Sequence, residues 1–174
     1  GFWGLALRYL KAPATLVGGA VSQALYPRLA PAGGQVAGCT VDGRRVVRRT
    51  MLLLAALAAP LVALLWFAGP VLFALAFGNA WAEAGILARA LALYIGLHFV
   101  ASPLGVVTMA WQAQGWALKL ALVGQAVFVA ALAAGLAWGG LVGAGWAVSV
   151  AMAVYFGWYF LRLATWPVTA QVAP

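Results

Sequence analysis

The stretch RYLKAPATLVGGAVSQALY, residues 8–26, decides the fold class, because it is long and apolar yet begins with two cations, Arg8 and Lys11. A helix rises about 1.5 Å per residue, so roughly 20 residues cross a hydrocarbon core of ~30 Å. The whole chain shares this character, since 67% of its 174 residues are hydrophobic and 7% are charged. In soluble domains about a quarter of the residues are charged. The apolar runs also lack the two-residue alternation of barrel strands. We therefore expect an all-α, polytopic membrane protein.

Five membrane-spanning helices are predicted along one transmembrane domain that covers residues 1–174. The hydropathy pattern places them at about 3–26, 50–69, 84–111, 116–138 and 140–162. The first ends at YPRLAPAGG, because Pro27 and Pro31 interrupt a helix. The turns WQAQG and WGG join the last three spans as antiparallel hairpins.

Local signals refine the second and third spans. The second carries Pro60 and meets Gly69 and Pro70, after which VLFALAF reads as a short interfacial helix. Asn79 is a candidate N-cap of the third span, and Pro103 is expected to kink it.

The orientation follows from the segment 27–49, which is predicted to be a basic loop. It holds five arginines and one acid, so the positive-inside rule places it in the cytoplasm. Lys119 and Arg162 fall on the same side. Topology thus explains the net charge of +8, and nucleic acid is not an expected partner. The N-terminus then lies outside without a signal peptide, so we expect an earlier span to be missing from this chain.

Arg8 heads a polar stripe on the first span. At ~100° per residue, Lys11, Thr15, Ser22 and Tyr26 lie on its face, opposite a face of Leu, Ala and Val. A cation at mid-bilayer costs ~2.5 kcal/mol or more, so polar faces turn toward the bundle interior or a cavity. Two interpretations stay open: the cations line an anion-binding cavity, or they reach the outer headgroups along the helix.

A second stripe runs along the third span. Tyr94, His98 and Ser102 share one face, and His98 lies about 20 Å along the helix, near the bilayer centre. His98 is either a hydrogen-bonded residue between helices or a proton relay. Arg89 and Glu83 lie near the outer end, where they are expected to reach the interface or pair with each other.

Small and aromatic residues give packing and interface signals. Gly145, Ser149, Ala153 and Gly157 recur every four residues in the fifth span, a pattern that lets another helix approach closely. Tryptophans near the span ends are typical of an aromatic belt; they are Trp3, Trp81, Trp111, Trp116, Trp138 and Trp166.

Several kinds of chemistry are not supported by the sequence. Cys39 is the single cysteine, so an internal disulfide or a cysteine metal cluster is excluded within these residues. The two acids, Asp42 and Glu83, fall on opposite sides of the membrane, which rules out a catalytic carboxylate pair in this chain. We predict no catalytic residue, no metal site and no cofactor.

The order of motifs resembles a known family. GFWGLALRYLKAPATLVGGAVSQALYPRLA is similar to the G-Y-Y-x-x-A-x-R-x-x-x-x-P helix ending V-x-Y-P-R of bacterial polysaccharide flippases of the O-antigen and exopolysaccharide type. FGNAWAEAGILARALALYIGLHFVASPLG resembles the F-G-x-x-W-x-x-A connection of these proteins, which belong to the multidrug/oligosaccharidyl-lipid/polysaccharide exporter superfamily. Phe2 and Trp3 replace the usual pair of tyrosines.

The resemblance implies a C-terminal lobe that faces a second lobe, missing here, around a central cavity. It implies transport of an undecaprenyl-diphosphate-linked oligosaccharide across the bacterial inner membrane by alternating access, for polysaccharide or lipopolysaccharide synthesis. Arg8 would correspond to the arginine of the family pattern and would meet the diphosphate. Lys11 has no fixed equivalent in that pattern; with Thr15 and Ser22 it shares the helix face of Arg8 and is a candidate for the same site. Lipids, the lipid-linked oligosaccharide and other polysaccharide-assembly proteins are the implied partners.

Other functions remain open at this stage. A lipid II flippase or a multidrug exporter would share the architecture, although exporters of cationic drugs usually need a cavity carboxylate. A membrane glycan polymerase or ligase would use His98 as its base. A membrane scaffold would need no polar stripe within the bilayer.

Overall fold

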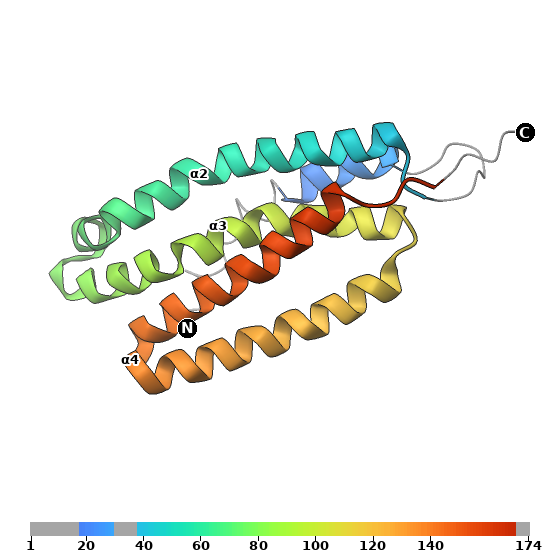
Figure 1. Cartoon of the computed structure of the whole chain (residues 1–174). Helices are drawn as coiled ribbons and strands as arrows, with labels where there is room; N and C mark the ends of the chain where they lie inside the picture. Colours follow the sequence, from blue (N-terminus) through green and yellow to red (C-terminus); the bar gives the residue numbers. More distant parts are fainter. Residues whose placement is uncertain (1–17, 30–37, 170–174) are drawn as a thin grey trace, which may run out of the picture.

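The described part of the chain forms a bundle of long antiparallel helices (Figure 1). The computed structural model describes residues 18–29 and 38–169, and within these ranges it contains helices and short connections but no strand. The elements are the helical segment 18–29, α2 (Val41–Phe77), the 3-10 helix η1 (Asn79–Trp81), α3 (Ala82–Ala110) and α4 (Gln114–Ala164). The all-α prediction is thus confirmed for the described part of the chain.

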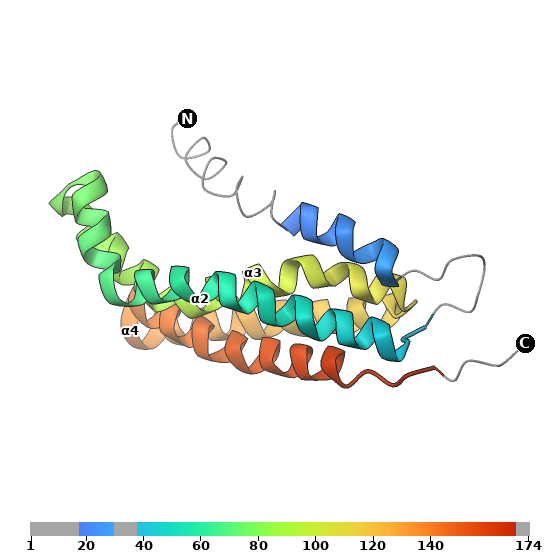
Figure 2. The same cartoon turned by 90° about the horizontal axis from the view of Figure 1, so that it is seen from above.

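Helix α4 turns back on itself at two glycines. Gly139 has φ −144° and Gly140 has φ +59° with ψ −150°, so the helix breaks there into a first half, 114–138, and a second half, 141–164. The two halves lie side by side in antiparallel directions (Figures 1 and 2). The predicted turn at WGG is therefore confirmed, as is the turn at WQAQG, where Gln112 takes a positive φ of 52°.

Within the described residues, three helices, α2, α3 and α4, are long and apolar enough to cross a membrane. Each half of α4 has about 24 residues, or ~36 Å, and is therefore long enough to cross alone. The last three predicted spans match α3 and the two halves of α4 within two residues. Residues 3–17 of the first predicted span lie outside the described residues, so the count of five stays a prediction.

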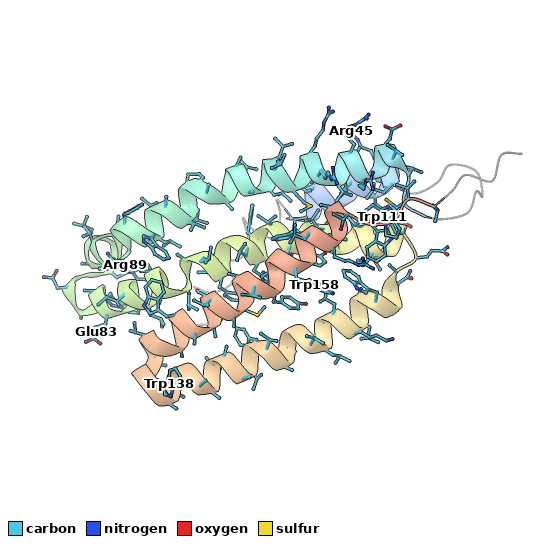
Figure 3. All side chains as sticks on the ribbon, in the orientation of Figure 1. Arg45, Glu83, Arg89, Trp111, Trp138 and Trp158 are labelled. Carbon is cyan, nitrogen blue, oxygen red and sulfur yellow. The ribbon has the colours of Figure 1, made fainter. Side chains whose placement is uncertain are left out.

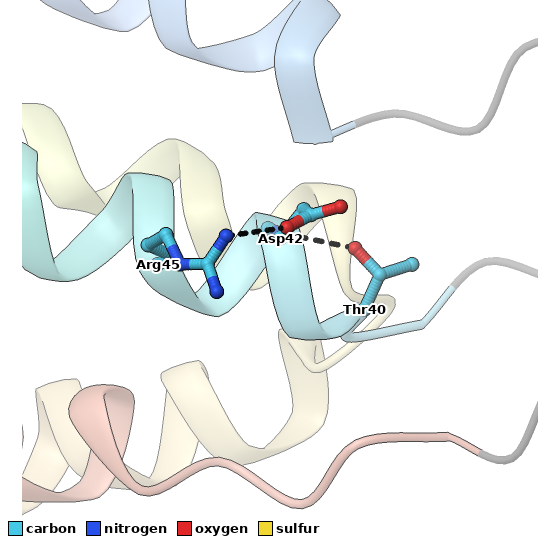
Figure 4. Close-up of polar contacts among 4 residues, drawn as sticks. Thr40, Asp42 and Arg45 are labelled. Atoms are coloured by element: carbon cyan, nitrogen blue, oxygen red, sulfur yellow. Dashed lines mark hydrogen bonds and ion pairs between the residues drawn. The ribbon is translucent and has the colours of Figure 1, made fainter.

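The predicted loop 27–49 was wrong for residues 27–29 and 41–49, which are helical, and α2 begins nine residues before the predicted start of the second span at residue 50. Helix α2 begins at Val41, because the Thr40 hydroxyl accepts a hydrogen bond from the Gly43 amide at 2.9 Å and caps the helix. Asp42 lies in the first turn, where a negative charge is favourable, and its carboxylate pairs with Arg45 at 3.1 Å (Figure 4). Arginine is a good helix former, so four of the five arginines that suggested a loop, Arg44, Arg45, Arg48 and Arg49, lie in the first turns of α2 instead.

Other predicted boundaries also moved. Helix α2 runs through Pro60 and Pro70 to Phe77, and Figure 2 shows it bending near this end, so VLFALAF is not a separate helix. Asn79 belongs to η1, whose N-cap is Gly78, and is not the N-cap of the third span. The segment 18–29 stays helical past Pro27, which the sequence had marked as its stop.

Helix α3 is the central element, and it packs against both α2 and α4. Beside α2, the backbones of Gly69 and Gly85 approach so closely that a Cβ built on Gly85 would lie 2.5 Å from the Pro70 Cα. Beside α4, the Ser149 hydroxyl donates to the Ala90 carbonyl at 2.5 Å, and a Cβ on Gly145 would meet Ala90. The small-residue face is therefore confirmed at Gly145 and Ser149.

One end of the bundle collects the positive charge. The Arg44 and Arg48 side chains of α2 donate to the carbonyls of Trp166 and Ala164, at 3.4 Å and 2.9 Å, which joins the start of α2 to the end of α4. Lys119 lies in the second turn of the same α4 and Arg162 in its last turn. We name this end the basic end; its cations are Arg28, Arg44, Arg45, Arg48, Arg49, Lys119 and Arg162.

Candidate functional site

An open groove lies between α3 and the two halves of α4. It has a volume of about 390 Å³. Three of its lining residues are Tyr94, His98 and Ser102, the residues that the sequence predicted to line a cavity. We name it the polar groove. Other lining residues that bear on its chemistry are Gly105 and Thr108 of α3, Leu120, Gly124, Gln125 and Phe128 of the first half of α4, and Tyr155, Phe156 and Tyr159 of the second half.

One face of α3 forms the floor of the polar groove. Steps of three and four residues from Tyr94 to Thr108 keep these side chains on one side of a helix. The 14 helical steps from Tyr94 to Thr108 cover ~21 Å, and this face extends from the middle of α3 toward the basic end. A Cβ on Gly105 would meet no atom within 4 Å, so the groove stays open there. The groove therefore occupies the half of the bundle nearest the basic end.

Aromatic rings bridge the groove at the middle of the bundle. The Tyr94 ring lies 5.7 Å from Phe128 on the first half of α4. The His98 ring lies 5.8 Å from Tyr94 and meets Phe156 edge to face at 6.1 Å. These contacts connect α3 to both halves of α4 and fix the orientation of the imidazole.

Tyr155 forms one wall of the groove. Its hydroxyl donates to the Leu120 carbonyl at 2.9 Å, which ties the two halves of α4 together. The ring lies so close to Gly124 that a Cβ there would come within 2.5 Å of it. A larger residue at position 124 would displace this wall.

The groove offers several polar groups but carries no carboxylate, lysine or arginine among the described residues that line it. Hydroxyl, imidazole and amide groups come from Ser102, His98 and Gln125, whose side chains are exposed in the groove. Thr108 is satisfied within its own helix, since its hydroxyl donates to the Gly105 carbonyl at 2.8 Å. Such a lining can hydrogen-bond a neutral, hydroxyl-rich molecule and stack its rings on aromatic faces.

The other predicted site residues lie elsewhere. Ser22 donates to the Pro103 carbonyl at 3.2 Å, and the segment 18–29 contributes nothing to the described lining of the groove. Helical spacing puts Pro103 on the side of α3 opposite His98. Ser22 is therefore a packing contact on the far side of α3. Arg8, Lys11 and Thr15 lie outside the described residues.

Arg89 and Glu83 lie toward the end of the bundle opposite the basic end (Figure 3). Glu83 is exposed, while the Arg89 Nε is buried and has no hydrogen-bond partner among the described residues. The described residues form one ion pair, Asp42 with Arg45, so the predicted pairing of Arg89 with Glu83 is not seen there.

Cys39 lies at the basic end, just before α2. Its side chain is 1% exposed, and its carbonyl accepts from the Thr169 amide at 3.0 Å. Burial raises the pKa of the thiol, and the charge of Arg44 partly opposes this rise. The described residues hold no cluster of His, Cys, Asp or Glu that could bind a metal ion.

Sequence reasoning missed Gln125 and the wall made by Tyr155. Gln125 was detectable, because it is the one polar side chain between Leu120 and Ala137. The same argument that selected His98 in the third span applies to it. Tyr155 gave no such signal, since its role depends on how the two halves of α4 pair.

Comparisons with models of known protein families, with curated proteins and with solved structures find no match to this chain. The fold therefore defines its class: a helical protein whose long apolar helices indicate a membrane protein. The particular function rests on the groove and on the sequence resemblance.

Proposed function

We propose that the chain is part of a transporter that moves an undecaprenyl-diphosphate-linked oligosaccharide across the bacterial inner membrane by alternating access. The observation that carries the proposal is the polar groove, in which Tyr94, His98 and Ser102 lie together within the half of the bundle nearest the basic end. Under the positive-inside rule this half faces the cytoplasm, where such a substrate is made available. The resemblance of the motifs to the polysaccharide flippases supports the same reading.

The groove suits the sugars rather than the diphosphate of this substrate. Its described lining is uncharged, while its aromatic faces and hydroxyl, imidazole and amide groups match the apolar faces and hydroxyls of a sugar ring. The diphosphate requires cations. Arg8 would supply one, as the family pattern implies, and Lys11 would add a second from the same predicted helix face. The second lobe implied by the resemblance would complete the cavity.

The experiment is leaflet translocation of the lipid-linked oligosaccharide in cells that carry the full-length gene. Ser102→Trp should reduce translocation at least tenfold, because the indole would occupy the groove. Ala126→Trp is the matched control, since Ala126 is exposed on the first half of α4 outside the groove. Equal translocation by the two variants at equal expression would contradict the proposal.

The role of the first span is tested separately. Arg8→Ala should impair translocation and Arg8→Lys should restore part of it, because a lysine keeps the charge but loses the bidentate geometry. Unimpaired translocation in both variants would leave the arginine as a headgroup anchor.

A membrane glycan polymerase or ligase is the second candidate, because His98 lies in the open groove. Against this candidate, the described residues that line the groove include no carboxylate that could orient the imidazole as a base. Under this candidate His98→Ala abolishes glycan transfer; persistent transfer would remove it.

A further inference from the structure

A second groove lies between the two halves of α4. Its volume is about 490 Å³, and Tyr155 and Leu120 line both it and the polar groove, so the Tyr155–Leu120 contact separates the two. Apolar side chains dominate its lining, among them Trp116, Val123, Val127, Val154 and Trp158. We name it the apolar groove. Figure 3 shows Trp158 where the two halves face each other.

The length of the apolar groove matches one leaflet of a bilayer. Along the first half of α4 it runs from Trp116 to Val127, and 11 residues of helix correspond to ~16 Å. Half of the hydrocarbon core is ~15 Å thick. The groove begins at the basic end, since Trp116 is the third residue of α4. Its dimensions therefore suit a hydrocarbon chain that enters from the leaflet at the basic end.

The start of the groove carries the groups that suit a lipid headgroup. Lys119 is exposed, and it is the one charged side chain among the described residues that line this groove. The rings of Trp116 and Trp158 lie 6.1 Å apart at the same end. Indole rings prefer the level of the headgroups, and an ammonium group there attracts a phosphate.

We propose that the apolar groove binds an acyl chain of an anionic glycerophospholipid, with the lipid phosphate beside Lys119. Charge complementarity selects the anionic headgroup, and the apolar lining selects the chain. A sugar headgroup is disfavoured here, because the described lining offers few polar atoms, unlike that of the polar groove. This binding site does not depend on the transport function.

The headgroup part of the proposal is tested by native mass spectrometry of the purified full-length protein. The probes are phosphatidylglycerol and phosphatidylcholine with identical acyl chains. The wild type should retain phosphatidylglycerol at least fivefold better, and Lys119→Ala should reduce this preference to less than twofold. Arg162→Ala is the control, because it removes a charge at the same end outside the groove. An equal loss in both variants would mean diffuse attraction to the basic end and would overturn the proposal.

The chain part is tested by filling the groove. Val123→Trp should lower the retention of both phospholipids at least threefold, whereas Leu122→Trp should not, because Leu122 is exposed but lies outside both grooves. If a thermal-shift assay shows that Val123→Trp does not fold, Val154→Trp is used in its place. Unchanged retention in the groove-filling variant would overturn the proposal. So would displacement of phosphatidylglycerol by an equimolar polyprenyl phosphate, because the groove would then hold the substrate's own chain.

Discussion

At the scale of single residues, the reversal of α4 depends on Gly140. Its φ of +59° with ψ −150° is a conformation that side chains strongly disfavour, whereas the φ of −144° at Gly139 is open to any residue. Gly140→Ala should therefore destabilise the protein by ~1–3 kcal/mol. Gly139→Ala should change its stability little. The melting temperatures of the two variants in detergent measure the difference, and equal values would contradict this role of Gly140.

The thiol of Cys39 should be protected in the folded protein. Maleimides attack the thiolate, and burial both covers this side chain and raises its pKa. Because the folded state prefers the neutral thiol, its contribution to stability is present below the unfolded-state pKa and is lost as the pH rises through the folded-state pKa. Labelling at pH 7.5 should thus be at least tenfold slower than in SDS and should accelerate with pH. Equal rates with and without SDS would contradict the burial of Cys39.

At the scale of helices, the contact between α2 and α3 depends on Gly85. A methyl group there would meet the backbone of Pro70 and Gly69, which cannot move aside as a side chain would. We expect Gly85→Ala to destabilise the protein by ~1–3 kcal/mol. Gly105→Ala is the matched control on the same helix, because nothing lies within 4 Å of its Cβ position. A thermal-shift assay that ranks Gly105→Ala as the more damaging change would contradict this packing.

Helix positions were largely predictable, whereas helix ends were not. Hydropathy located α3 and both halves of α4 within two residues, because the length of a membrane span limits where it can lie. Helix α2 begins nine residues before the predicted second span, because the sequence prediction took a run of arginines for a loop. The cap made by Thr40 is a local hydrogen bond that hydropathy does not detect.

At the scale of the whole molecule, the ends of α2 and α4 are joined at the basic end. Arg48 donates to the Ala164 carbonyl at 2.9 Å, near the C-terminus of α4, where a cation is favourable. Arg48→Ala should therefore destabilise the protein by about 1 kcal/mol, or roughly 2–4 °C in Tm. Arg49→Ala removes the same charge from the neighbouring exposed residue and should have a smaller effect. A larger loss in Arg49→Ala would contradict the joining role of Arg48.

The candidate site was predictable in part. Tyr94, His98 and Ser102 were predicted as site residues because they are polar residues within an apolar span. The structure brings these three into one groove. Ser22 has the same signature, yet it packs against α3 through the Pro103 carbonyl. A polar stripe indicates that a face avoids lipid, but only the arrangement of neighbouring helices decides whether that face meets a cavity or another helix.

The central claim is that the polar groove holds the glycan of a lipid-linked substrate. Photo-crosslinking in cells tests it most directly, with a photoreactive amino acid in place of Gln125 in the groove or of Leu122 outside it. The account predicts a crosslink to the lipid-linked oligosaccharide from position 125 that is at least tenfold stronger than the crosslink from position 122. Equal crosslinking from both positions, or none from position 125 at normal expression, would contradict it.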